Sequence, residues 1–182
     1  MIRRAAAAAI VLALALGMTT ACQPEPAPSA SGPVFANEEE AFAAAEETYR
    51  AYVDALNQVD LSDPETAEAV LVWTIGKAND EDRQGYERLR EAGATVNGKS
   101  LLVSASHESA SDLANAWTVV LGVCLDVSDV KLEDAEGTSM VDPSRPDIQS
   151  IDVNLVSSDK TPTGLAIAET RPAQEAERCI AS

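Results

Sequence analysis

Two side chains in this sequence have types that could carry acid–base chemistry. His107 is the only histidine of the chain, and histidine is the side chain whose ordinary pKa lies nearest to neutral pH. It stands at the end of an expected strand over residues 100–107 and is followed by Glu108 and Ser109, a context that predicts an exposed turn. Asp126 could act only if its carboxylate points into a pocket. The sequence therefore predicts no catalytic residue, with His107 and Asp126 as two weak candidates.

Motifs for metals and cofactors are not found in the sequence. Cys124 and Cys179 are far apart, and no His/Cys cluster has the spacing of a zinc site. A run of acidic residues crowds one expected hairpin, but it lacks the spacing of a calcium-binding loop and is expected to be a solvated face. This run consists of Asp126, Asp129, Glu133, Asp134 and Glu136. A glycine-rich phosphate loop is also missing, so we expect no metal site and no cofactor.

The charge balance limits the partners of the protein. The chain of 182 residues has 30 acidic against 13 basic side chains, which gives a formal net charge of −17. Nucleic acids and anionic lipid surfaces are bound through clustered Lys and Arg, so we exclude nucleic acid as a partner. The length fits one ordinary domain.

The first 22 residues have the layout of an export signal. Arg3 and Arg4 supply a positively charged start, and residues 5–17 form an apolar stretch. This stretch is too short to span a membrane and is typical of a signal peptide. The segment ends in the letters TTAC, in which the last residue is Cys22. These four residues resemble the lipobox of bacterial lipoproteins, with Thr19 standing where that family prefers an aliphatic residue.

The resemblance to lipoproteins implies a lipid anchor. In that family the cysteine thiol receives a diacylglyceryl group, and the cysteine becomes the mature N-terminus. Residues 1–21 would then be a lipoprotein signal peptide, and Cys22 the lipidation site that anchors the chain at the extracytoplasmic face of the cell membrane. Residues 22–36, rich in Pro and Ser, would be an extended tether, and residues 37–182 a single α+β domain. The alternative is a plain secreted protein in which Cys22 is a free thiol.

The lipid also bears on the two other cysteines. If it takes Cys22, then Cys124 and Cys179 remain as an even pair in an oxidising compartment, which predicts a disulfide between them. Such a bridge would hold residues 173–182, which lack a periodic apolar pattern, against the domain. The alternative is two unrelated reduced thiols.

Three helices are expected to begin the domain. Asn37 starts a capping-box pattern, and apolar residues then recur at steps of three and four along a helix of about 20 residues. Asp63, followed by proline, opens a short second helix. Asn79 or Asp80 is expected to begin a third helix, which ends at Gly93.

Strands are expected to follow the helices. Apolar residues alternate with other residues in the later part of the chain, as in strands that bury one face. Helices first and antiparallel strands afterwards predict an α+β fold with three N-terminal helices packed on a curved antiparallel sheet. The expected strands cover residues 100–107, 114–128, 138–141, 151–155 and 164–170.

The order of elements over residues 37–170 resembles the NTF2-like (SnoaL-like) fold, a cone common in bacterial lipoproteins. Two hypotheses follow from this resemblance. The first is a membrane-anchored, non-catalytic domain that binds a cell-envelope protein or a small apolar ligand. The second is an NTF2-like enzyme with an acid–base group inside its cone. The abundance of alanine, and of arginine over lysine, indicates a GC-rich Gram-positive source, as in actinobacteria.

Overall fold

The computed structural model of the protein describes residues 35–173 and 176–179. The expected signal peptide, Cys22 and most of the tether lie outside these residues. Three helices come first: α1 (Glu38–Leu56), α2 (Pro64–Leu71) and α3 (Gly76–Glu91). Six strands and a short 3-10 helix, η1 (Ala176–Cys179), follow them. The strands are β1 (Thr95–Asn97), β2 (Leu101–Leu113), β3 (Ala116–Asp126), β4 (Lys131–Glu133), β5 (Ile148–Ser157) and β6 (Leu165–Pro172).

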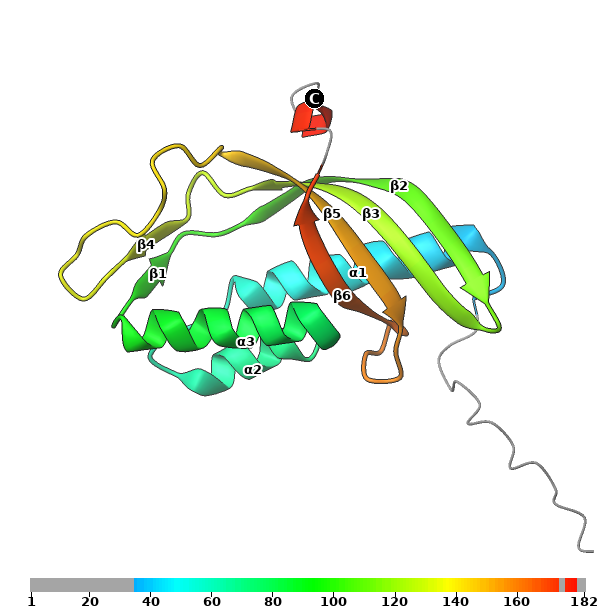
Figure 1. Cartoon of the computed structure of the whole chain (residues 1–182), viewed down its shortest axis with the longest axis horizontal. Coiled ribbons are helices and arrows are strands. Elements are labelled where there is room, and N and C mark those ends of the chain that lie inside the picture. The colour runs from blue at the N-terminus through cyan, green and yellow to red at the C-terminus, as the bar shows by residue number, and fades with distance from the viewer. Residues whose placement is uncertain (1–34, 174–175, 180–182) are drawn as a thin grey trace, which may run out of the picture.

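Four of the strands form one antiparallel sheet in the order β2-β3-β5-β6, and β1 pairs with β4 in a separate two-stranded sheet. The long strands arc over α1, and α2 and α3 lie beside it (Figure 1). The predicted α+β architecture, with three N-terminal helices and antiparallel strands, is therefore confirmed.

The core lies between α1 and the sheet. Phe42, Ala45, Tyr49 and Val53 recur at helical spacing along α1 and are buried. Each large apolar side chain that is fully buried contributes roughly 1.5–3 kcal/mol, so this contact supplies much of the stability of the domain. The sheet contributes to the same core Val119, Leu121, Val123 and Leu125 of β3, Val153 and Leu155 of β5, and Leu165 and Ile167 of β6.

The first two helices begin where the sequence predicts. Asn37 Oδ1 accepts a hydrogen bond of 3.0 Å from the backbone N–H of Glu40. Asp63 Oδ1 accepts one of 3.0 Å from the backbone N–H of Glu65. Both side chains thus satisfy backbone donors that the first turn of a helix leaves without a partner.

The third helix begins earlier than predicted. It starts at Gly76, and its N-cap residue makes no side-chain hydrogen bond. Asn79 is not a cap, because its side-chain amide donates instead to the carbonyl oxygen of Leu71 at 2.9 Å. The predicted start at Asn79 or Asp80 is therefore wrong. The end of the helix is as predicted, since Gly93 follows it with a left-handed φ of 62°.

The strands differ from the prediction at several places, and the short strands β1 and β4 were not predicted at all. β2 continues past His107 through an irregularity in its pairing with β3. It ends at a turn in which Ala114 and Asn115 have φ values of 57° and 63°, and these two residues thus separate β2 from β3. The short strand expected at residues 138–141 is reduced to one isolated bridge between Glu133 and Ser139.

The described part of the chain begins at the turn-bearing end of the sheet. The ring of Phe35 packs edge-on against Trp117, with 6.1 Å between the ring centroids. Trp117 is the second residue of β3, so Phe35 lies near the β2–β3 turn. The opposite end of β3 pairs with the start of β5, where Asp126 is opposite Ile148.

Candidate functional site

His107 lies within β2 and faces α1. Its ring stacks on Phe42 with 4.2 Å between centroids, and its Nε2 is 2.8 Å from Glu46 Oε1. Partial burial alone would raise the pKa of Glu46, but the hydrogen bonds from His107 and Arg50 outweigh this effect and lower it. The predicted turn placement is wrong because β2 runs on beyond this residue. The predicted exposure is correct, since 45% of the imidazole side chain is exposed.

Asp126 lies at the last position of β3, away from His107. Its carboxylate accepts a hydrogen bond of 2.9 Å from the backbone N–H of Ser128, and its bonds with that residue lower its pKa. His107 pairs with Leu121, which faces α1, whereas Asp126 follows Leu125 and has the opposite orientation. The two candidates thus lie on opposite faces of the sheet and do not form one site.

Asp82 is a perturbed carboxyl group that the sequence did not single out. It lies on α3, half-buried, and Tyr52 Oη donates to its Oδ2 at 3.5 Å. Burial raises the pKa of Asp82 to about 6 against the opposing effect of the hydrogen bond from Tyr52, and the charge of Glu81 adds to the rise. The charge of Asp82 in turn adds to burial in raising the pKa of Tyr86. The only feature of the sequence that could have indicated this pair is the spacing of four residues between Asp82 and Tyr86, which places both on one side of α3.

The predicted disulfide is present. Cys124 of β3 and Cys179 of η1 are joined, with their Cα atoms 5.5 Å apart. Cys124 alternates with Val123 and Leu125, which face α1, so the bond holds η1 on the opposite face of the sheet. The end of the described chain is therefore fixed to the outer face of the domain.

Arg178 reinforces this attachment next to the disulfide. Its Nη1 lies 2.7 Å from Glu108 Oε1 on β2, and its Nη2 lies 2.7 Å from Asp152 Oδ1 on β5. The guanidinium lies over Gly122 of β3, where a Cβ atom would overlap it. A glycine at this position thus lets one arginine connect the strands on either side of β3.

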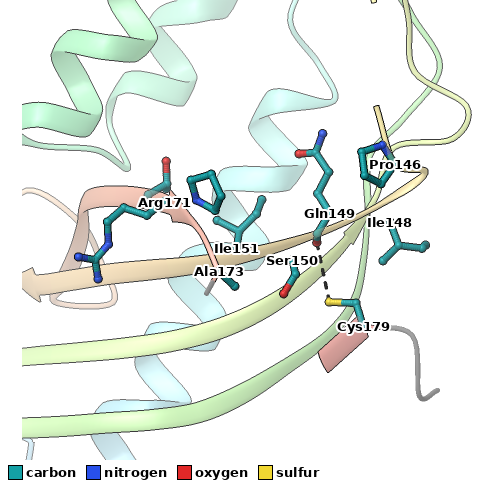
Figure 2. Close-up of a pocket in the computed structure, with 10 residues that line it drawn as sticks. Pro146, Ile148, Gln149, Ser150, Ile151, Arg171, Ala173 and Cys179 are labelled. Carbon is teal, nitrogen blue, oxygen red and sulfur yellow. Dashed lines mark hydrogen bonds between the residues drawn. The ribbon is translucent and has the colours of Figure 1, made fainter. Parts of the chain in front are cut away.

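An apolar hollow of about 850 Å³ opens beside η1, between the start of β5 and the end of β6 (Figure 2). This volume is within the usual range for small-molecule sites, which are mostly apolar with a few polar groups. Ile148, Ile151 and Pro172 supply much of its apolar surface, and Cys179 places the disulfide at its wall. The other lining residues are Pro146, Gln149, Ser150, Thr170, Arg171 and Ala173.

The catalytic candidates lie outside this hollow. His107 lines a separate surface depression of about 370 Å³, together with Glu46 and Arg50 of α1. Asp126 and Asp82 are not among the residues that line the apolar hollow. The hollow can therefore hold an apolar molecule, but the lining residues that the structure describes provide no carboxyl or imidazole group for proton transfer.

Metal sites and membrane spans were sought in the same part of the chain. Within residues 35–173 and 176–179, no group of three or more His, Cys, Asp or Glu side chains is placed to hold a metal ion. In those residues no helix combines the length and the apolar character needed to cross a membrane.

Comparisons with known proteins give a likeness of fold. No protein-family model matches the chain, and no curated protein matches it. The intermembrane space region of the chloroplast protein ARC6 is similar in structure, with a TM-score of 0.50 and 12% identity over 71% of this chain and 94% of that one. The periplasmic domain of DotI gives a TM-score of 0.47 and 11% identity over 78% of this chain and all of the other. At such identities the first likeness concerns the fold alone, and the second is too weak to carry an argument.

Proposed function

We propose that the protein is a lipid-anchored lipoprotein of the extracytoplasmic face of the cell membrane, with an NTF2-like domain that binds a small apolar ligand without catalysis. The apolar hollow of about 850 Å³ is the observation that carries the binding function. The lipobox-like sequence that ends at Cys22 supports the anchor. The bond between Cys124 and Cys179 supports an oxidising compartment.

The anchor is tested by the mass and location of the full chain in its native host. The wild-type protein is expected in the membrane fraction, with a diacylglyceryl group and any further acyl chain on Cys22 and without residues 1–21. Cys22→Ser should abolish the lipid. The double variant Cys124→Ser/Cys179→Ser is the matched control, because it also removes thiols but leaves the lipidation site. Wild-type protein with an unmodified Cys22 would refute the anchor.

Ligand binding is tested by native mass spectrometry of the protein extracted from its own membrane. A non-covalent adduct that is lost on denaturation is expected, whereas the covalent lipid stays attached. Ile148→Asp places a charge at the wall of the hollow and should remove the adduct. Leu113→Asp makes the same change at a side chain that is 77% exposed near the β2–β3 turn, and should retain the adduct. A wild-type protein without an adduct, or an adduct unaffected by Ile148→Asp, would contradict the proposal.

The alternative function, an NTF2-like enzyme, would need an acid–base group in a cavity. Asp82 is the one observation in its favour, because its pKa is raised to about 6 and catalytic carboxyl groups are often perturbed in this direction. Its carboxyl group lies between α1 and α3 near Tyr52 rather than in the apolar hollow. Binding without catalysis is therefore the better supported function.

A further inference from the structure

The charge of the residues around the hollow differs from that of the chain. Acidic residues outnumber basic ones by 30 to 13 over the sequence, yet none of the lining residues that the structure describes is acidic. Arg171, near the end of β6, is the only charged residue among these described lining residues (Figure 2). The described wall of the hollow thus combines a mainly apolar surface with one positive charge.

Arg171 has no partner within the part of the chain that the structure describes. No hydrogen bond or ion pair to its guanidinium is found there. The acidic residue nearest along β6, Glu169, has its Oε1 2.7 Å from Lys77 Nζ. The hydrogen bond from Lys77 is the main cause of its lowered pKa, to which the charge of Arg171 adds less.

Two of the neighbouring charged groups are engaged with other residues. Asp152, which pairs with Arg171 in the sheet register, binds Arg178 at 2.7 Å. Arg145, which precedes the lining residue Pro146, donates to the carbonyl oxygens of Val127 at 2.8 Å and of Val130 at 3.1 Å. Arg171 is therefore the basic side chain at the hollow that is left to bind an anionic group.

We propose that the ligand of the hollow is an amphiphile with an apolar body and a carboxylate head, and that Arg171 binds this head. This inference rests on the proposed binding function and names the class of the ligand. Guanidinium groups match carboxylates and phosphates through paired N–H donors. The hollow offers one arginine, and the net charge of the whole chain is −17. A head with one negative charge is therefore repelled less than a doubly charged phosphate monoester.

The proposal is tested by photo-crosslinking of the full chain in membrane vesicles. One probe is a hexadecanoic acid with a diazirine in its chain, and the other is the methyl ester of the same acid. The acid should label peptides that contain Ile148 or Pro172 about tenfold more than the ester, as expected for one charge-assisted hydrogen bond at the head. Arg171→Gln should remove this preference and leave labelling by the ester unchanged.

The controls separate failure of this inference from failure of the proposed function. Arg90→Gln makes the same change on the exposed surface of α3 and should retain the preference for the acid. Equal labelling of the hollow by both probes in the wild type would overturn the role of Arg171 but support an apolar site. Hexadecyl phosphate competing better than hexadecanoate would overturn the carboxylate head. Labelling of the hollow by neither probe would count against both proposals.

Discussion

A methyl group at position 122 should disrupt the attachment of the C-terminal segment. In Gly122→Ala the added Cβ would occupy the place of the Arg178 guanidinium, which rests on the glycine. Arg178 cannot simply withdraw, because the next residue, Cys179, is bonded to Cys124. The arginine would instead have to leave its carboxylate partners while η1 stays attached.

The expected cost follows from the exposure of the charged groups. The Arg178 side chain is 19% exposed, and its partners Glu108 and Asp152 are 42% and 21% exposed. Hydrogen bonds to charged groups contribute about 1.5–3 kcal/mol when shielded, and exposed ion pairs about 0–1 kcal/mol. Loss of both pairs should thus cost about 2–3 kcal/mol. Replacement of glycine by alanine also lowers the conformational entropy of the unfolded chain, which stabilises the folded state by about 0.4–1 kcal/mol. The net destabilisation is then about 1–2 kcal/mol.

The assay is urea unfolding at neutral pH of the wild type, Gly122→Ala, Arg178→Ala and the double variant, all with the disulfide intact. The two substitutions should couple by about 2–3 kcal/mol, since the alanine at position 122 has nothing to displace once the guanidinium is removed. In the Arg178→Ala background, Gly122→Ala should be neutral or slightly stabilising. Additive effects, with a coupling below about 0.5 kcal/mol, would refute the placement of Arg178 over Gly122.

Three further predictions concern stability. Reduction of the bond between Cys124 and Cys179, 55 residues apart in sequence, should lower the free energy of unfolding by about 4 kcal/mol in the chain-entropy model; equal urea midpoints with and without reductant would contradict it. The folded-state pKa of Asp82 is raised from 3.8 to about 6. The stability that comes from a protonated Asp82 in the folded protein is therefore fully present below about pH 4 and is lost as the pH rises through 6. Asp82→Asn should remove this loss, about 1–2 kcal/mol after allowance for partial solvation, and an unchanged pH profile of thermal unfolding would be the opposing result. Asn37→Ala should cost about 1 kcal/mol by removing the α1 cap, whereas Asn97→Ala, at an exposed position of β1, should leave the same melts nearly unchanged; equal effects of the two substitutions would contradict the role of Asn37.

The helix starts could be predicted where the signal is local. Asn37 and Asp63 are standard cap residues, and each makes its hydrogen bond within its own first turn. The start of α3 could not be predicted in this way, because Ile75 has no capping side chain and Asn79 binds a carbonyl oxygen of α2. The β2–β3 turn was not predicted, because two consecutive positive φ angles are usually marked by glycine, asparagine or aspartate, and the first of the two positions here is Ala114.

The candidate site was predictable only in its covalent part. The count of three cysteines, with Cys22 assigned to the expected lipid, was enough to pair Cys124 with Cys179, because the two that remain have one possible bridge. The hollow depends on the antiparallel pairing of Ile151 with Pro172, which brings together segments without a shared motif. The raised pKa of Asp82 depends on packing between α1 and α3, which the pattern of either helix alone does not specify.

The position of Phe35 at the end of the sheet far from the hollow has a practical consequence. Phe35 contacts Trp117 at one end of β3, whereas the hollow lies near Ile148, which pairs with the other end. At about 3.4 Å per residue, these positions are roughly 30 Å apart. A protein that is shortened to begin at Phe35 and coupled to a sensor chip through that residue would therefore present the hollow to the flowing sample. Cys179, at the wall of the hollow, is by contrast only four positions before the first residue of any purification tag added after Ser182.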